Sequence, residues 1–238
     1  MIETNNLTKR FGGQTALNGL TITVEPGEIV CLLGANGAGK TTTLNLLLGY
    51  LQPDEGRAEV CGIRPDEDAT GARRHIAYVP EMVTLYPNLT GIENLTFFHA
   101  LGGGAKTSHD ELAPHLDAAG LPREAAGRRV SGYSKGMRQK VALAAAFARQ
   151  AKVWLLDEPF SGLDPHAAAE LSAALRQAAQ SGVAILMASH DLFRTRELAT
   201  RAGILREGEL VELLDPTTID HAGLERIYIE HMTDKAAA

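Results

Sequence analysis

Short apolar runs alternate with longer helical patterns along most of this chain. The runs at 29–33, 153–156 and 183–188 are apolar at consecutive positions, which is typical of strands covered on both faces of an α/β sheet. Strands are expected at 21–24, 28–33, 57–60, 75–79, 153–157, 183–188, 203–205 and 209–212. A strand at 2–7 and a turn near Gly12-Gly13 predict an antiparallel lead-in, and the letters REGEL at 206–210 predict a late hairpin.

The middle of the chain, about 85–150, has a helical pattern instead. Thr90 and Glu93 have the spacing of a capping box, and the letters LGGGAKTSHD predict a flexible break between two helices. The segment 109–126 is helix-prone, with breaks expected at Pro114, Gly120 and Pro122. We therefore expect an α-helical subdomain inserted into one domain of residues 1–230, followed by a short tail at 231–238.

Composition narrows the class of protein. The chain has 238 residues, of which 45% are hydrophobic and 22% charged, as in ordinary soluble domains. A net charge of −6 predicts no bulk attraction to nucleic acid or to an anionic membrane. The longest apolar run, at 141–148, is far shorter than the roughly 20 residues that span a bilayer. No signal peptide is expected, and Cys31 and Cys61 are interpreted as buried free thiols in a reducing, cytoplasmic setting.

A glycine-rich loop carries the clearest chemical signal. It follows the strand at 28–33 and precedes a helical pattern, which is the order that a P-loop requires. Glycines in such a loop let backbone N–H groups surround phosphate oxygens. Its lysine would reach the β- and γ-phosphates, and the next hydroxyl would face Mg²⁺. The loop predicts a nucleoside triphosphate site formed by Gly34, Ala35, Asn36, Gly37, Ala38, Gly39, Lys40, Thr41 and Thr42.

Two adjacent acids follow the apolar strand at 153–157. Asp157 stands at the strand's carboxyl end, where it could hold Mg²⁺, and Glu158 could activate a water against the γ-phosphate. A solvated acidic turn is the plainer interpretation of this pair, but the P-loop makes it less attractive. His190 follows another apolar strand and could donate a hydrogen bond to the γ-phosphate; alternatively it is structural, with Asp191 capping the next helix.

The segment GYSKGMRQK at 132–140 is rich in basic residues. It could be a patch for nucleic acid or lipid, a helix start that meets phosphate, or merely a solvated loop. Ser134 is a good N-cap and Gly136 permits close backbone approach, so the second interpretation is favoured. Lys135, Arg138 and Lys140 are then expected around that helix end, some facing phosphate and others solvent.

These motifs, in this order, resemble the nucleotide-binding subunit of ATP-binding cassette transporters over about residues 2–230. Phe11 stands where that family places a ring against adenine, and YVPE at 78–81 brings Glu81 to the position of a glutamine loop. YSKGM at 133–137 aligns with the family signature, and SGLD at 161–164 brings Asp164 to a loop that crosses to a partner subunit. Tyr133, Lys135 and Met137 depart from the commonest signature, in a pattern similar to bacterial exporters of the drug, polysaccharide and lantibiotic-immunity kind.

The resemblance implies an α/β fold: a P-loop NTPase core with a mixed sheet, an N-terminal antiparallel β subdomain and the inserted helical subdomain. It implies an ATPase that uses ATP and Mg²⁺. Catalytic roles fall on Glu158, His190 and Lys40; metal contacts fall on Thr41, Asp157 and Glu81. Nucleotide contacts fall on Phe11, the 34–42 loop, Ser134, Gly136 and Asp164.

The same resemblance implies partners. Two nucleotide-binding subunits, expected as a homodimer, would pack head to tail with each ATP between one subunit's loop and the other's signature. A separate polytopic membrane permease would hold the protein at the inner face of the cell membrane. No nucleic acid partner and no regulatory domain after 224–234 are expected.

Two other classes of protein share parts of this pattern. A soluble cassette ATPase acting on DNA or ribosomes would need a long coiled coil or a second cassette, and the sequence shows neither. Another P-loop enzyme, such as a nucleotide kinase, would not need the signature, the SGLD segment and His190 together. We expect the transporter subunit.

Overall fold

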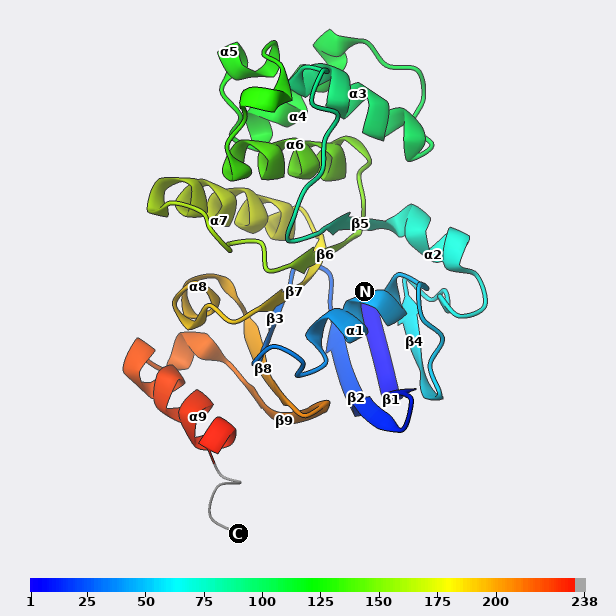
Figure 1. The fold of residues 1–238 in the computed structure, drawn as a ribbon, viewed down its shortest axis with the longest axis vertical. Coiled ribbons are helices and arrows are strands. Elements are labelled where there is room, and N and C mark those ends of the chain that lie inside the picture. Colours follow the sequence, from blue (N-terminus) through cyan, green and yellow to red (C-terminus); the bar gives the residue numbers. More distant parts are fainter. Residues whose placement is uncertain (234–238) are drawn as a thin grey trace.

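The computed structural model describes residues 1–233. Figure 1 shows a group of helices at one end of the molecule, a central sheet below it, and a smaller sheet beside the N-terminus. The long helix α7 (Pro165–Gln180) lies between the helical group and the central strands.

The central sheet brings together strands that are far apart in the sequence. Within the described residues it has six strands in the order β5-β6-β7-β3-β8-β9. β3, β5, β6, β7 and β8 run parallel, whereas β9 pairs antiparallel with β8. Their bounds are β3 Ile29–Leu33, β5 Ile76–Val79, β6 Val153–Asp157, β7 Ala184–Ser189, β8 Arg201–Arg206 and β9 Glu209–Leu214. The carboxyl ends of β3, β6 and β7 therefore meet at one edge, where ligands bind in open parallel sheets.

A second sheet is antiparallel, in the order β2-β1-β4. Its strands are β1 Ile2–Phe11, β2 Gln14–Val24 and β4 Glu55–Val60. β1 and β2 are longer than expected because their register shifts repeatedly, and positive φ angles at Asn6 and Gly19 interrupt the alternation of apolar and polar side chains.

The helices cover both faces of the central sheet. Besides α6 (Lys135–Ala148) and α7, the helices packed on the strands are α1 Lys40–Leu47, α2 Ala69–His75, α8 Leu192–Leu198 and α9 His221–Thr233. The helical end of the molecule contains α3 Gly91–Leu101, α4 His109–Ala118, α5 Arg123–Ala126 and α6. Short 3₁₀ turns lie at Val130–Gly132 and Pro216–Thr218.

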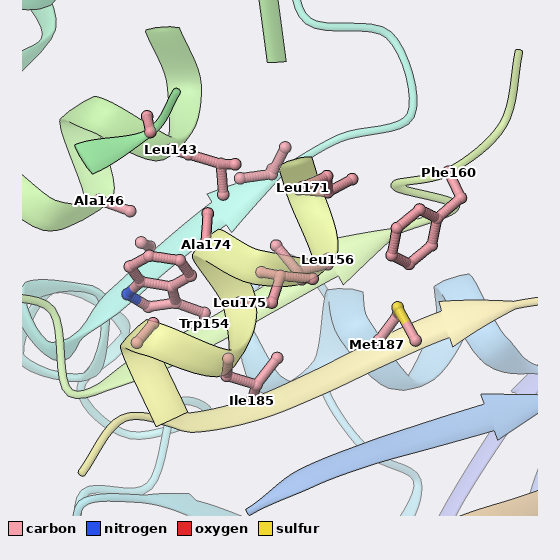
Figure 2. Packing of buried hydrophobic residues seen from close by; sticks show 14 of the residues in the cluster. Leu143, Ala146, Trp154, Leu156, Phe160, Leu171, Ala174, Leu175, Ile185 and Met187 are labelled. Atoms are coloured by element: carbon pink, nitrogen blue, oxygen red, sulfur yellow. The ribbon is translucent and has the colours of Figure 1, made fainter. Parts of the chain in front are cut away.

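Alternate residues of each central strand enter two different cores. In β6, Trp154 and Leu156 pack toward α6 and α7, while Val153 and Leu155 face the smaller sheet. Figure 2 shows the first core, in which Trp154 and Ile185 lie beneath Leu171 and Leu175 of α7. Fully burying each of these large side chains contributes about 1.5–3 kcal/mol, so both faces of the strand fix the position of its carboxyl end.

Every strand expected from the sequence is present; the strand at 153–157 has the expected bounds, and the others begin or end at different residues. His75 belongs to α2, which the sequence analysis missed, and β5 starts one residue later. The capping box of Thr90 and Glu93 is confirmed, as is the cap of α8 by Asp191.

Three expectations were wrong. Pro114 lies inside α4 and does not break it. The proline is exposed and so is Asp110, the residue whose carbonyl loses a helical partner, so water can satisfy that oxygen. Cys61 is half-buried, unlike the fully buried Cys31. The expected tail at 231–238 begins too early because α9 continues to Thr233; residues 234–238 lie outside the described residues.

Candidate functional site

The loop after β3 turns directly into α1. Gly37 and Gly39 have φ angles of 83° and 108°, a left-handed conformation that strains any other residue. Gly39 is the N-cap of α1, and over the described residues no side chain caps that helix end. The first-turn N–H groups and the positive end of the helix dipole therefore remain available to an anion.

The loop glycines serve two different purposes. A Cβ on Gly34 would lie 2.5 Å from the Leu205 carbonyl oxygen, and one on Gly39 would lie 2.7 Å from that of Ala16. At Gly37 a Cβ would meet nothing within 4 Å. Gly34 and Gly39 thus let the loop pack against neighbouring strands, and Gly37 faces the open side. From the sequence, all three glycines were expected to serve phosphate binding alone.

This difference gives a stability prediction for two matched variants. Gly37→Ala and Gly39→Ala both place a side chain in a left-handed conformation, which costs about 1–2 kcal/mol. Gly39→Ala adds a backbone clash, and such overpacking typically costs a further 1–3 kcal/mol or so. Urea unfolding without nucleotide should therefore show the larger loss for Gly39→Ala. Equal losses would mean that the contact with Ala16 relaxes freely.

Lys40 begins α1 and is almost buried, with 6% of its surface exposed. Its ammonium group donates to the carbonyl oxygens of Gly34 and Ala35 and lies 3.6 Å from a Glu158 carboxylate oxygen. The Lys40 ammonium group therefore contacts its own loop, where the phosphate groups of a nucleotide would bind.

A hydroxyl and a carboxylate meet on one side of the loop. The Thr41 hydroxyl donates to Asp157 Oδ2 at 3.2 Å. Burial raises the pKa of Asp157, the Thr41 hydrogen bond lowers it, and the nearby charges of Glu158 and Glu81 raise it further. Glu81 lines the same cavity and accepts a hydrogen bond of 3.0 Å from the Ser161 hydroxyl. A cation at this position would relieve the repulsion among the carboxylates.

Glu158 occupies a strained turn just beyond β6. Its φ angle is 45°, although it is not glycine, and its backbone N–H donates to the Ala188 carbonyl oxygen at 2.9 Å. One carboxylate oxygen lies 2.9 Å from His190 Nδ1 and the other faces Lys40. His190 itself is 62% exposed at the end of β7. Non-glycine residues held in left-handed conformations cluster at functional sites, where surrounding contacts hold them in place.

Lys40, Thr41, Glu81, Asp157 and Glu158 line one cavity of about 370 Å³. Gly34 and His190 are not among its lining residues. Phe11 forms its far wall, 47% exposed, with the Lys9 ammonium 5.5 Å from the ring centroid. Gln14 and Ala16 also line it and were missed by the sequence analysis, although they follow Phe11 across the β1–β2 turn. The remaining lining consists of residues 35–42, Glu81, Asp157 and Glu158.

Ser134, Gly136 and Asp164 are not in this cavity. Ser134 is exposed and caps α6, its hydroxyl oxygen accepting from the Met137 N–H at 3.2 Å. Asp164 is exposed and caps α7, accepting from the Ala167 N–H at 2.9 Å, and this hydrogen bond lowers the Asp164 pKa. A Cβ on Gly136 would lie 3.2 Å from the Ala167 Cβ, so this glycine lets α6 and α7 approach within one subunit.

The basic residues after Ser134 do not all surround the end of the helix. Lys140 was expected there, but it is buried and forms an ion pair of 2.7 Å with Glu170 of α7. It is five residues beyond Lys135, more than one helical turn, so its side chain reaches α7 rather than the capped end.

The donor set of the cavity suits a triphosphate with Mg²⁺. Backbone N–H groups and Lys40 suit phosphate oxygens, and an aromatic wall suits a base. Mg²⁺ usually takes one or two carboxylates plus substrate phosphates and waters, which matches Thr41, Asp157 and Glu81. Within residues 1–233 no group of three or more His, Cys, Asp or Glu side chains forms a metal cage by itself.

Several known proteins are similar to this chain. The family model described as ABC transporter matches residues 17–161. The chain is 38% identical over 211 residues to the Nod factor export ATP-binding protein I of Burkholderia lata, covering 88% of this chain and 69% of that one. It is 37% identical to the bacitracin transport ATP-binding protein BcrA of Enterococcus faecalis, covering 89% and 68% respectively.

Solved structures have the same fold. One, the ATP-binding subunit of an ABC transporter, has a TM-score of 0.85 at 30% identity, covering 98% of this chain and all (100%) of that one. Another is a dimeric ATP-binding cassette in a post-hydrolysis state with ADP and Pi, with a TM-score of 0.80 at 26% identity, covering 91% and 99%. Among the described residues, no helix is both long enough and apolar enough to cross a membrane.

Proposed function

The chain belongs to the ABC transporter family, and on that premise we propose that its cavity hydrolyses ATP to power export through a separate membrane subunit. The observation that carries this proposal is that two pairs of side chains lie beside the same loop. Thr41 and Asp157 form the metal side, while Glu158 and His190 form the side from which water attacks.

The residues divide the reaction between them. Lys40 leaves Glu158 and neutralises the β- and γ-phosphates of ATP, while the N–H groups of the loop surround their oxygens. Thr41 and Asp157, with Glu81 beside them, would hold Mg²⁺, which would supply positive charge to the phosphate groups.

Glu158 then acts as the general base. It takes a proton from a water whose oxygen bonds to the γ-phosphorus as the bond to the ADP oxygen breaks, so the products are ADP and phosphate. His190, held by Glu158 at 2.9 Å, donates a hydrogen bond to the γ-phosphate. Phe11 stacks on the adenine.

A second copy completes each site. Ser134 and Asp164 are exposed helix caps outside the cavity, so their positive helix ends are available to a partner. In the head-to-tail homodimer, Ser134 and Gly136 meet the γ-phosphate of the ATP bound by the other subunit, and Asp164 crosses near the same interface. The dimeric cassette with ADP and Pi supports this arrangement by likeness.

The permease docks in a second cavity, of about 670 Å³, between the segment after Pro80 and the helical end of the molecule. Arg73, Arg74 and Arg149 line it together with Tyr78 and Phe98, and no carboxylate is among its described lining residues. Burial lowers the pKa of Arg149. A partner segment with an apolar face and acidic side chains fits this groove, and such docking places the protein at the inner face of the cell membrane.

Purification with the permease tests the function. We expect the chain to co-purify with a polytopic membrane protein encoded beside its gene, and its ATP turnover in lipid vesicles to rise with the transported compound. Arg74→Glu should weaken that association through charge repulsion and leave turnover by the isolated chain unchanged.

The runner-up function gives the opposite result. Activation by DNA or ribosomes, with no membrane protein retained, would favour a soluble cassette ATPase and contradict the proposal. Arg176→Glu, on an exposed face of α7 outside the groove, is the matched control for the charge reversal.

A further inference from the structure

One buried amide joins the helix of the signature to the turn that carries Glu158. Gln139 of α6 is only 2% exposed, and its Nε2 donates a hydrogen bond to the Pro159 carbonyl oxygen. Because that carbonyl can only accept, the nitrogen of the amide must face it. Gln139 Oε1, by contrast, is buried without a hydrogen-bond partner in the described structure.

The unpartnered oxygen points to a role other than stability. Burying a polar atom without a partner is unfavourable, and a leucine of similar size would avoid that cost. An amide is nevertheless present, and its one hydrogen bond goes to the residue directly after Glu158. Gln139 therefore differs from an apolar side chain of similar size in one useful respect, which is the N–H group that it donates to the Pro159 carbonyl.

The turn that it contacts is strained, and its other contacts include those of Lys40 and His190 with the Glu158 carboxylate. Glu158, with its φ of 45°, donates its N–H to Ala188 O and accepts at its carbonyl from the Ser161 N–H at 3.1 Å. Both bonds come from the sheet or from the turn itself. Gln139 adds a bond from α6 to the next residue, Pro159.

The helix that supplies this bond packs against α7, the helix that follows the Glu158 turn. Gly136 lets α6 approach Ala167, and Lys140 pairs with Glu170 at 2.7 Å. Gln139 lies between these two contacts in the sequence. The amide is thus held at a fixed place relative to the turn, as a positioning group must be.

We propose that Gln139 is a positioning residue for hydrolysis, which fixes the Glu158 turn from α6 through the Pro159 carbonyl. This inference rests on the proposed function, because it requires Glu158 to act as the base. Gln139 is buried and does not line the cavity. Its loss changes where the carboxylate stands, and not whether ATP binds.

Gln139→Leu in the full chain tests the proposal. We expect kcat for Mg-ATP to fall about 10-fold or more, since misplacement by roughly 1 Å can cost about 10²-fold. The KM and the Kd for ATP should stay unchanged. The melting temperature should change little. The Pro159 carbonyl oxygen loses its hydrogen-bond donor, but the unpartnered Gln139 Oε1 is removed by the same substitution. Gln177→Leu, an exposed glutamine on α7, is the matched control.

A double variant separates positioning from a general structural effect. In the Glu158→Gln background, Gln139→Leu should cause no further loss of residual turnover, because there is no base left to position. If Gln139→Leu fails to fold, Gln139→Met, which is unbranched and adaptable, is measured in the same way.

Three results would overturn the inference: normal kcat, a parallel loss of ATP affinity, or the same fold-loss when Glu158 is already replaced. Failure of the proposed function looks different. In that case Glu158→Gln itself would turn over normally, whatever the result for Gln139.

Discussion

Glu158→Gln should lose steady-state hydrolysis while still binding ATP, and it should accumulate as a closed dimer. The side chain keeps its size and can still contact His190, 2.9 Å away, but it can no longer accept a proton from water. General-base assistance is typically worth about 10²–10⁴ in rate, so turnover should fall by that factor. Phosphate release measures turnover, and size-exclusion chromatography with Mg-ATP measures the dimer.

The control for this variant is Glu225→Gln, which removes the same charge from an exposed glutamate of α9 that does not line the cavity. It should behave as wild type. Normal turnover in Glu158→Gln would remove Glu158 from the role of base. Loss of ATP binding would instead mean that the carboxylate serves mainly to hold the nucleotide site together.

Ser134→Arg should abolish hydrolysis even though the Gly34–Thr42 loop of the same chain is intact. The long cationic side chain would project from the exposed cap of α6 and fill the space that the partner's γ-phosphate enters. ATP should still bind each monomer, and Mg-ATP should no longer produce a dimer. Equilibrium nucleotide binding and the ATP dependence of dimerisation measure these two effects separately.

Ser134→Arg also removes a helix cap, which costs about 0.5–2 kcal/mol. Ser134→Ala loses the same cap without adding bulk, so the difference between the two variants isolates the blocking effect. Ser181→Arg, at the exposed far end of α7, tests for any effect of an added arginine. Equal losses in Ser134→Ala and Ser134→Arg would mean that helix stability, not access of phosphate, explains the result.

The central strands were predicted correctly because a strand that is buried on both faces has apolar residues at consecutive positions. In β3 and β6, nearly every residue is apolar because both cores use the same strand. The edges were harder to predict. β1 and β2 contain register shifts and positive φ angles, and these depend on pairing between strands rather than on the pattern within either one.

The functional site was likewise predicted only in part. The order of motifs, read with the family resemblance, brought the loop, Asp157 and Glu158 to one cavity, as the structure also does; their chemical roles stay predictions. The packing of Gly34 and Gly39 depends on carbonyl groups of Leu205 and Ala16, which no local pattern indicates. Gln139 was missed for the same reason, because its partner is a backbone carbonyl twenty residues away in the sequence.

Mixed dimers test the proposed head-to-tail arrangement of two subunits most directly. Two dimers are prepared, one with Ser134→Arg and Glu158→Gln in the same subunit and one with them in opposite subunits. If Ser134 serves the partner's ATP, the opposite arrangement concentrates both defects in one site and leaves the other site intact, whereas the same-subunit arrangement damages both sites.

Single-turnover ADP formation by the two mixed dimers is the deciding measurement. The account predicts that the dimer with substitutions in opposite subunits forms ADP at its one intact site, and that the dimer with both in one subunit forms none. The reverse result, ADP only from the dimer with both substitutions in one subunit, would show that Ser134 serves its own subunit's ATP and would contradict the account.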